Sequence, residues 1–157
     1  MIIKRENLWE RPLPDYLCVT TNANIWSSKL VMGKGFALQV KYRYPQCEYH
    51  FAGKIKSKSR KLPNSTNNVY ENYYLVEMRF RGQNFILFQT KEDYRENSKL
   101  EIIKEAAKRL AELANSRPDK SFYLPCPGVG QGKLDEKTVL EAINFLPDNV
   151  TVFIYGK

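Results

Sequence analysis

The stretch that decides the fold of this chain is Pro127-Gly128-Val129-Gly130-Gln131-Gly132-Lys133, which lies between an apolar segment, Ser121-Phe122-Tyr123-Leu124, and a helical pattern. Glycine adopts backbone angles that other residues avoid and lets a ligand approach the main chain closely. Free amides beside a helix start also offer hydrogen-bond donors and a positive dipole to a phosphate. This stretch alone is weak evidence, because glycine also serves ordinary turns.

A second stretch of the same kind lies upstream, Met32-Gly33-Lys34-Gly35-Phe36-Ala37, at the start of another helical pattern. Both stretches follow an expected strand and lead into an expected helix. Sheets whose strands alternate with helices bind ligands at the carboxyl ends of the strands, where these connections gather. Two glycine loops on that edge therefore predict a diphosphate site.

The rest of the chain alternates between strand and helix patterns. We expect strands at Met1–Lys4, Tyr16–Thr20, Glu71–Phe80, Asn84–Gln89, Ser121–Leu124 and Val150–Tyr155, and helices at Gly35–Arg43, Leu100–Leu113 and Asp135–Phe145. Arg81-Gly82-Gln83 is typical of a hairpin connection. This order predicts an α/β fold with a mostly parallel or mixed sheet and helices on its faces. The length of 157 residues, without an internal repeat, predicts a single domain over residues 1–157.

Two local patterns give more specific expectations. Ser98-Lys99-Leu100-Glu101 fits a capping box, with Ser98 as the N-cap of the following helix and Glu101 reaching back to it. Five cations crowd the stretch from Lys54 to Lys61, and a polar run follows at 63–68, which together predict a mobile basic loop. Such a loop could contact phosphates, although a merely solvated loop is the more common case.

The second glycine loop nearly matches the phosphate loop of nucleoside triphosphatases. That pattern needs glycine, four residues, then glycine, lysine and serine or threonine. Here Pro127 stands at the first glycine and Leu134 replaces the hydroxyl residue that binds magnesium. The match fails at the residues that carry the chemistry, so we reject it.

Composition bounds the partners. The net charge of +8 and pI near 9.4 favour anionic partners, with DNA or RNA contact through a basic surface as one candidate and a simple soluble basic protein as the other. The scattered Cys18, Cys47 and Cys126 predict reduced thiols in a cytoplasmic protein. With His50 as the single histidine we expect no metal site, and we expect no cofactor. The apolar runs are too short to span a membrane, and the start of the chain lacks the apolar run of a secretory signal.

Three motifs in order resemble those of a known family. Cys18-Val19-Thr20-Thr21-Asn22 with Val31-Met32-Gly33-Lys34-Gly35-Phe36-Ala37-Leu38-Gln39 resembles the first ADP-ribose loop of macrodomains, and Leu124-Pro125-Cys126-Pro127-Gly128-Val129-Gly130-Gln131-Gly132 resembles their second phosphate loop. A third motif, Phe88-Gln89-Thr90-Lys91-Glu92-Asp93-Tyr94-Arg95, is similar to the lysine-containing segment of the DNA ADP-ribosyl glycohydrolase antitoxins. The resemblance is closest to these antitoxins, to the terminal ADP-ribose protein glycohydrolase and to their phage and bacterial relatives. The resemblance is weakest between Gln46 and Asn68. It implies a three-layer α/β/α fold with a central mixed sheet.

The resemblance also implies roles for individual residues. Asn7, in Asn7-Leu8-Trp9, takes the place of the acidic residue that holds the adenine amino group, and Tyr155 matches an aromatic position near the adenine ring. Asn22 would contact the distal ribose, which carries the scissile bond. Met32, Gly33, Gly35 and Phe36 would line the distal ribose and phosphate, and Gly128, Val129, Gly130, Gln131 and Gly132 would wrap the diphosphate, with Lys133 beside them.

Lys91 is the candidate catalytic residue. In the glycohydrolase relatives the matching lysine acts at the anomeric carbon, in some through a covalent lysyl intermediate, which requires a neutral amine. The usual alternative is a solvated lysine at a strand end. Without a gap, Lys133 falls where the terminal ADP-ribose glycohydrolase has its catalytic aspartate. Asp135 is near in sequence but is more typical of a helix cap. Glu92 and Asp93 are then candidate bases only by their proximity to Lys91, and Lys133 could lower the pKa of Lys91 or strengthen phosphate binding.

Several functions fit these features. The first hypothesis is an enzyme that hydrolyses the bond between ADP-ribose and a modified macromolecule, either nucleic acid or protein, with Lys91 and Asn22 in the catalytic roles. The second is a module that binds ADP-ribose or a related nucleotide without turnover, and the third is an ADP-ribose-1″-phosphatase. A plain nucleic-acid-binding domain comes last, because it leaves the glycine loops unexplained.

Overall fold

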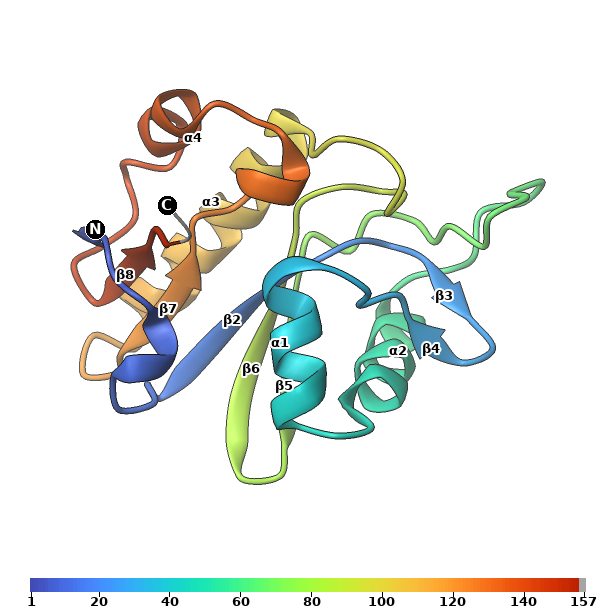
Figure 1. Cartoon of the computed structure of the whole chain (residues 1–157), viewed down its shortest axis with the longest axis horizontal. Helices are drawn as coiled ribbons and strands as arrows, with labels where there is room; N and C mark the ends of the chain where they lie inside the picture. Colours follow the sequence, from blue (N-terminus) through green and yellow to red (C-terminus); the bar gives the residue numbers. More distant parts are fainter. Residues whose placement is uncertain (156–157) are drawn as a thin grey trace.

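The chain folds around a six-stranded mixed sheet, shown in Figure 1. The computed structural model describes residues 1–155. The sheet has the order β1 (Ile2–Lys4), β8 (Val150–Phe153), β7 (Phe122–Pro125), β2 (Tyr16–Thr21), β6 (Gln83–Gln89) and β5 (Leu75–Phe80). All neighbouring strands run parallel except β5, which is antiparallel to β6 at one edge. A two-stranded ribbon, β3 (Ile25–Trp26) and β4 (Lys29–Leu30), lies in what the sequence predicted as a plain loop.

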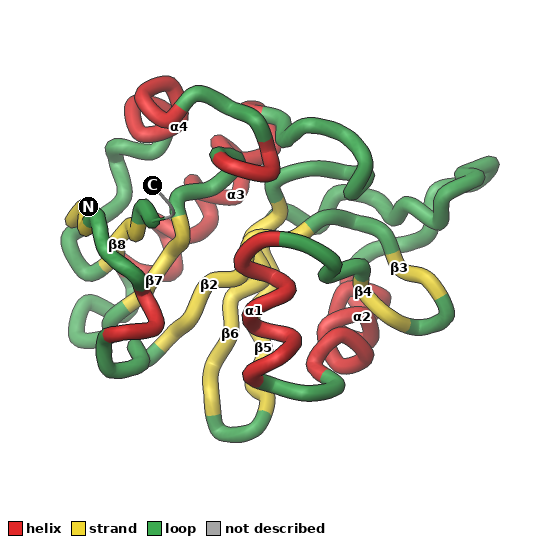
Figure 2. The backbone as a smooth tube through the Cα atoms, in the orientation of Figure 1, coloured by secondary structure: helices red, strands yellow, loops and turns green. Residues whose placement is uncertain are grey.

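The parallel strands bring five chain segments to one edge of the sheet. The carboxyl ends of β1, β8, β7, β2 and β6 point the same way, so the loops that follow them gather along that edge, as the green connections in Figure 2 show. Both glycine loops and the segment that carries Lys91 are among these connections. The sheet topology therefore assembles the expected site from three separate parts of the sequence.

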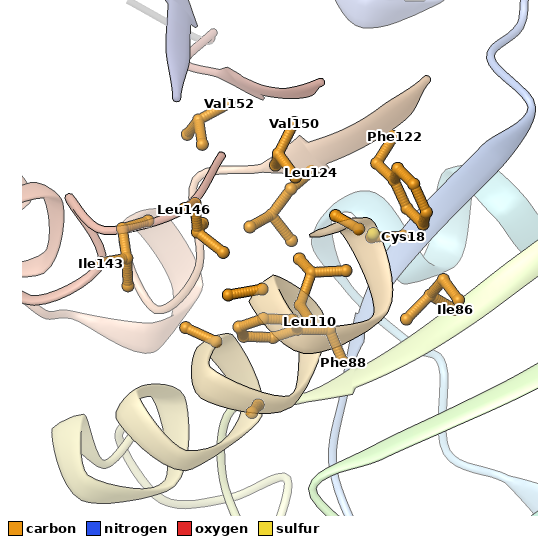
Figure 3. Close-up of a cluster of buried hydrophobic side chains, with 14 of the residues drawn as sticks. Cys18, Ile86, Phe88, Leu110, Phe122, Leu124, Ile143, Leu146, Val150 and Val152 are labelled. Atoms are coloured by element: carbon orange, nitrogen blue, oxygen red, sulfur yellow. The ribbon is translucent and has the colours of Figure 1, made fainter. Parts of the chain in front are cut away.

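Two hydrophobic cores lie on the two faces of the sheet. In β2, Tyr16 and Cys18 face one core and Leu17 and Val19 face the other, because successive strand side chains point to opposite faces. The first core, in Figure 3, packs against α3 (Leu100–Asn115) and α4 (Glu136–Ala142). The second packs against α1 (Gly35–Arg43) and α2 (Cys47–Lys58). This arrangement is the three-layer α/β/α architecture that the sequence implied.

Helix α3 carries the buried stripe that its pattern predicted, but it does not begin with a capping box. Ile103, Ala107 and Leu110 are fully buried against the sheet. Lys99, not Ser98, occupies the N-cap position, and no side chain caps the helix. The Ser98 amide instead donates to the carbonyl of Gly132 at 2.9 Å. The residue that the sequence pattern assigned to the helix cap is therefore bonded to the second glycine loop.

The predicted mobile basic loop is wrong at its start. Lys54, Lys56 and Lys58 belong to α2, which runs to Lys58, and only the residues after it form a loop. Phe51 and Ile55, four residues apart, are fully buried and hold this helix on the sheet. Lys54, Lys56 and Lys58 therefore lie on the surface of a helix that is packed on the sheet.

The three cysteines are free and buried. Burial raises the pKa of both Cys47 and Cys126 to about 12, so these thiols stay protonated near neutral pH. Within residues 1–155, no group of three or more His, Cys, Asp or Glu side chains could hold a metal ion. None of the helices in that range is long and apolar enough to cross a membrane.

Candidate functional site

The first glycine loop is closed by the side chain of Asn22. Its Nδ2 donates to the carbonyl of Val31 at 3.0 Å, and its Oδ1 accepts from the amide of Asn24 at 3.0 Å. The hydroxyl of the buried Tyr73 donates to the carbonyl of Asn22 at 2.7 Å and also bonds Thr21. Asn22 is thus a structural staple across the loop, with one N–H still free to reach a ligand.

The start of α1 leaves main-chain donors at this edge. Gly35 begins the helix with a φ of +61°, a conformation that favours glycine, and the preceding Lys34 caps it with no side-chain hydrogen bond. The first amides of a helix have no acceptor within the helix. Gly33, Lys34 and Gly35 are all exposed, so these donors face solvent and can bind an anion.

The second glycine loop is folded tightly onto α3. A Cβ at Gly128 would come within 2.6 Å of Ile103 Cδ1, and a Cβ at Gly132 within 2.3 Å of Ser98 Oγ. The amides of Lys133 and Leu134 are consumed by bonds to Gly130 at 3.1 Å and Gly128 at 2.8 Å. The short turn η2 (Gly130–Gly132) therefore presents its first amides on a rigid base.

The two glycine loops are adjacent at Gly35 and Gln131. A Cβ added at Gly35 would lie 3.5 Å from Cγ of Gln131, which is ordinary van der Waals distance, across the edge of the sheet. Neither loop is near the other in sequence, so only the parallel sheet brings them together. The anion cradle that the sequence predicted would lie where these two loops come together.

The Lys91 segment is tied to both loops. The amide of Ala23, at the start of the connection from β2 to the first glycine loop, donates to the carbonyl of Glu92 at 2.9 Å, and the amide of Ser98 donates to the carbonyl of Gly132 in the second loop. The amide of Lys99 donates to the carbonyl of Thr90 at 2.9 Å, which closes the segment at its base. Lys91 is one residue from that closure, so its main chain is fixed relative to both glycine loops.

The surroundings of Lys91 lower the pKa of its amine. Burial lowers the pKa of Lys91 below its ordinary value, and the positive charge of Lys34 lowers it further, while Asp93 and Glu96 act in the opposite direction. Lys34, in the first glycine loop, supplies the charge that the sequence suggested for Lys133. Lys34 stands out in the sequence as the residue between two glycines, but only the tertiary contact gives it this role.

Two acidic residues next to Lys91 in the sequence, Glu92 and Asp93, are engaged elsewhere. Glu92 forms an ion pair with Lys99 and accepts a hydrogen bond from Asn72. Asp93 accepts hydrogen bonds from Asn67 at 2.8 Å and from Arg95. Burial raises the pKa of Asp93, but these hydrogen bonds outweigh it and leave the pKa below its ordinary value. Neither carboxylate is therefore positioned as a free general base.

The comparisons with known proteins fit this geometry. The sequence matches no protein-family model and no curated protein. Among solved structures, the macrodomain of Mycobacterium tuberculosis DarG is 27% identical with a TM-score of 0.66, over 100% of this chain and 98% of that one. The macrodomain of Thermus aquaticus DarG is 25% identical with a TM-score of 0.66, over 99% and 97%. The chain has the macrodomain fold.

A third similar structure, Thermosipho africanus DarTG in complex with ADP-ribose, is 24% identical with a TM-score of 0.63. It covers 90% of this chain but only 38% of that protein. The macrodomain fold thus accounts for almost all of this chain and for well under half of that relative.

The macrodomain fold brings the expected adenine-side residues to the same edge, with different exposures. Asn7 Oδ1 accepts from the amide of Trp9 at 3.1 Å, which leaves one lone pair for an adenine amino group. Tyr155, just after β8, is 71% exposed, so one ring face is open to stacking. Leu8 and Met32 are buried in the core, so their side chains cannot line a ligand and any contact from them must come from the main chain.

Two expected residues near the second loop behave differently from each other. Asp135 caps α4, accepting from the amide of Thr138 at 3.0 Å, and this hydrogen bond lowers its pKa. The prediction that Asp135 is a helix cap is thus confirmed. Lys133 is exposed with a φ of +67° at the end of η2, where it adds a positive charge beside the macrodomain loop.

A stack of aromatic and cationic groups at the first loop was missed from the sequence. The rings of Trp9 and Phe36 are stacked at 5.1 Å with 9° between planes, and the Arg43 guanidinium lies 4.1 Å from the Trp9 ring centre. The indole N–H of Trp9 donates to Gln39 at 2.6 Å. The spacing of Phe36, Gln39 and Arg43 along α1 was the available signal, since these positions share one helix face. Trp9 therefore fixes the ring that the macrodomain resemblance assigned to the distal ribose.

Proposed function

We propose that this chain binds ADP-ribose where its two glycine loops meet and hydrolyses the bond between the distal ribose and a macromolecular acceptor, either nucleic acid or protein. The observation that carries the proposal is the contact between the loops at Gly35 and Gln131, with the Lys91 segment tied to both. The similarity to a DarTG structure in complex with ADP-ribose supports the ligand.

In this proposal each part of the site has one task. The amides of the two loops hold the diphosphate, the stacked Phe36 and the remaining N–H of Asn22 face the distal ribose, and Tyr155 stacks on the adenine. Lys91, as a neutral amine, attacks the anomeric carbon, and the bond to the acceptor breaks as the acceptor takes up a proton. Water then cleaves the lysyl intermediate and restores the amine.

The second step needs a base that activates water. With Lys133 in place of a carboxylate and with Glu92 and Asp93 held by other groups, neither of the two bases proposed from the sequence is free for this task. This favours a binding module that retains ADP-ribose without turnover as the second candidate. An ADP-ribose-1″-phosphatase would use the same loops but would not need Lys91.

The test has two steps. Calorimetric titration with ADP-ribose measures binding. An absence of binding at millimolar concentrations of ADP-ribose would overturn the proposal that ADP-ribose is the ligand. Wild type, Lys91→Ala and the control Lys104→Ala are then incubated with an ADP-ribosylated oligonucleotide, an ADP-ribosylated protein and ADP-ribose-1″-phosphate. Lys104 is an exposed residue on α3, and its substitution by alanine removes the same charge as Lys91→Ala.

Release of ADP-ribose from either macromolecule by wild type and Lys104→Ala, but not by Lys91→Ala, supports the hydrolase. Binding without release by any variant supports the binding module. Loss of the phosphate, independent of Lys91, supports the phosphatase.

A further inference from the structure

The open edge of the sheet carries a depression that the proposed site does not use. It has a volume of about 630 Å³ and runs beside the edge strand β5, away from both glycine loops. Its walls come from helices on opposite faces of the sheet, with Lys54 and Lys58 from α2 on one side and Arg109 from α3 on the other. The floor is formed by β5 residues, among them Val76 and Glu77.

The main chain of β5 is available for pairing. The two-residue turn at Arg81-Gly82 makes Phe80 and Gln83 a hydrogen-bonded pair, so the main-chain groups of Glu77 and Arg79 point away from β6. No other described segment donates to or accepts from these groups. An edge strand of this kind is a template for one more strand.

The cations beside this edge are mostly unneutralised. Within the described chain, no carboxylate lies within ion-pair distance of Lys54 or Lys58. Arg109 pairs with Glu105 at 2.9 Å, lies 4.7 Å from the Tyr74 ring centre and donates to the carbonyl of Tyr73 at 3.4 Å, so its guanidinium is held at the rim. The two lysines without a carboxylate partner therefore favour an occupant that carries negative charge.

We propose that β5 binds an acidic, extended segment of a partner protein as an additional strand. Side chains at alternate positions of such a strand are about 6.6 Å apart, which matches the spacing of about 6 Å between residues four apart on a helix. Two acidic residues at alternate positions thus face Lys54 and Lys58, and the acidic residue between them points to the opposite face, toward Arg109. This inference goes beyond the proposed ADP-ribose function and does not depend on it.

Other occupants fit the edge less well. A second copy of this chain paired through β5 would bring the lysines of both copies together, which is unfavourable. A nucleic-acid strand matches the cations, but its sugar-phosphate backbone cannot complete the ladder of main-chain hydrogen bonds.

The experiment measures fluorescence polarisation of a labelled peptide of about eight residues with three successive Glu residues at its centre and Val and Thr on both sides. A second peptide carries Gln in place of Glu, and a third has the Glu sequence with alternate amides N-methylated to block the ladder. Proteins are wild type, the double variant Lys54→Gln/Lys58→Gln, and the control Lys104→Gln/Lys108→Gln. The control pair is exposed on α3, has the same spacing and charge, and does not line the depression.

We expect the Glu peptide to bind at least about tenfold more tightly than the Gln and N-methylated peptides at low salt. We expect the Lys54/Lys58 variant to lose about tenfold and the control less than about threefold. Equal binding of the N-methylated peptide, equal loss in both variants, or tighter binding of an oligothymidine of matched charge would overturn the proposal. Self-association of wild type that the Lys54/Lys58 variant abolishes would also overturn it, in favour of a second copy. ADP-ribose titration of the same variants reports separately on the glycine-loop site.

Discussion

The two glycine loops look alike in sequence, but the structure holds them by different means. In the second loop, Gly128 lies against Ile103 and Gly132 lies against Ser98. A side chain at Gly128 would therefore collide with α3, and a side chain at Gly132 would collide with Ser98. In the first loop, Gly33 has open space where a Cβ would lie, and Gly35 meets only Gln131. The first loop is shaped by side chains instead, through the Asn22 staple and the Trp9 stack.

This difference separates two uses of glycine in a ligand loop. Glycines packed on the core keep the second loop rigid, so substituting them changes folding stability before it changes binding. Gly33 keeps the first loop accessible, so substituting it changes ligand approach with little effect on folding, whereas the positive φ of Gly35 still favours glycine there. The following predictions test that division, from the largest expected effect to the smallest.

Substitution of the packed glycine gives the largest effect. Gly128→Ala places a methyl group 2.6 Å from Ile103 Cδ1 at a φ of +79°, so we expect a loss of about 2–4 kcal/mol in unfolding free energy. Gly33→Ala, the matched change in the first loop, is expected to cost less than about 1 kcal/mol, because nothing lies within 4 Å. Urea denaturation of both variants measures this, and equal losses would erase the distinction between the loops.

Removing half of the Asn22 staple tests what shapes the first loop. Asn22→Asp keeps an acceptor for the amide of Asn24 but removes the donor to Val31, and it places a negative charge near the anion cradle. We expect a loss of about 1–3 kcal/mol in stability and weaker ADP-ribose binding, measured by thermal unfolding and calorimetry. The control Asn144→Asp changes an exposed residue near the end of the chain. Unchanged stability in Asn22→Asp would mean that the staple does not hold the loop.

The Trp9 stack predicts a binding effect with a spectroscopic signature. Trp9→Leu removes the ring that is stacked on Phe36, so we expect about five- to tenfold weaker ADP-ribose binding. We also expect a loss of about 1 kcal/mol in unfolding free energy, in addition to the loss from the smaller buried apolar surface. In a Trp26→Phe background, Trp9 is the single tryptophan of the chain and its fluorescence should change on adding ADP-ribose. A silent Trp9 together with unchanged affinity in Trp9→Leu would place the stack outside the site.

The smallest effect concerns the pH dependence of turnover. In the proposed mechanism Lys91 acts as the neutral amine, so activity is expected to rise with pH as Lys91 loses its proton. Burial and the charge of Lys34 lower the pKa of Lys91 and move that rise toward neutral pH. Lys34→Gln removes the second cause, so the rising limb of kcat/KM should move to higher pH, whereas Lys133→Gln should leave it in place. A limb that moves with Lys133→Gln instead would assign the effect to the second loop.

Much of the fold followed from local patterns in the sequence. The apolar, β-branched run in β2 and the buried spacing along α3 predicted their elements to within a few residues. Patterns that depend on a neighbour were misread. Ser98 has the sequence of a helix cap, but its amide is needed by Gly132, and the lysines of α2 resemble a loop until Phe51 and Ile55 are placed against the sheet.

The sequence by itself determined the α/β class and the two glycine loops, because hydrophobic periodicity and glycine placement act over a few neighbouring residues. Only the tertiary structure decided that Gly35 meets Gln131, that Lys34 rather than Lys133 affects Lys91, and that Trp9 fixes Phe36. These contacts join residues distant in the chain. Their energies depend on burial and on distances that exist only after the parallel strands have placed their loops along one edge.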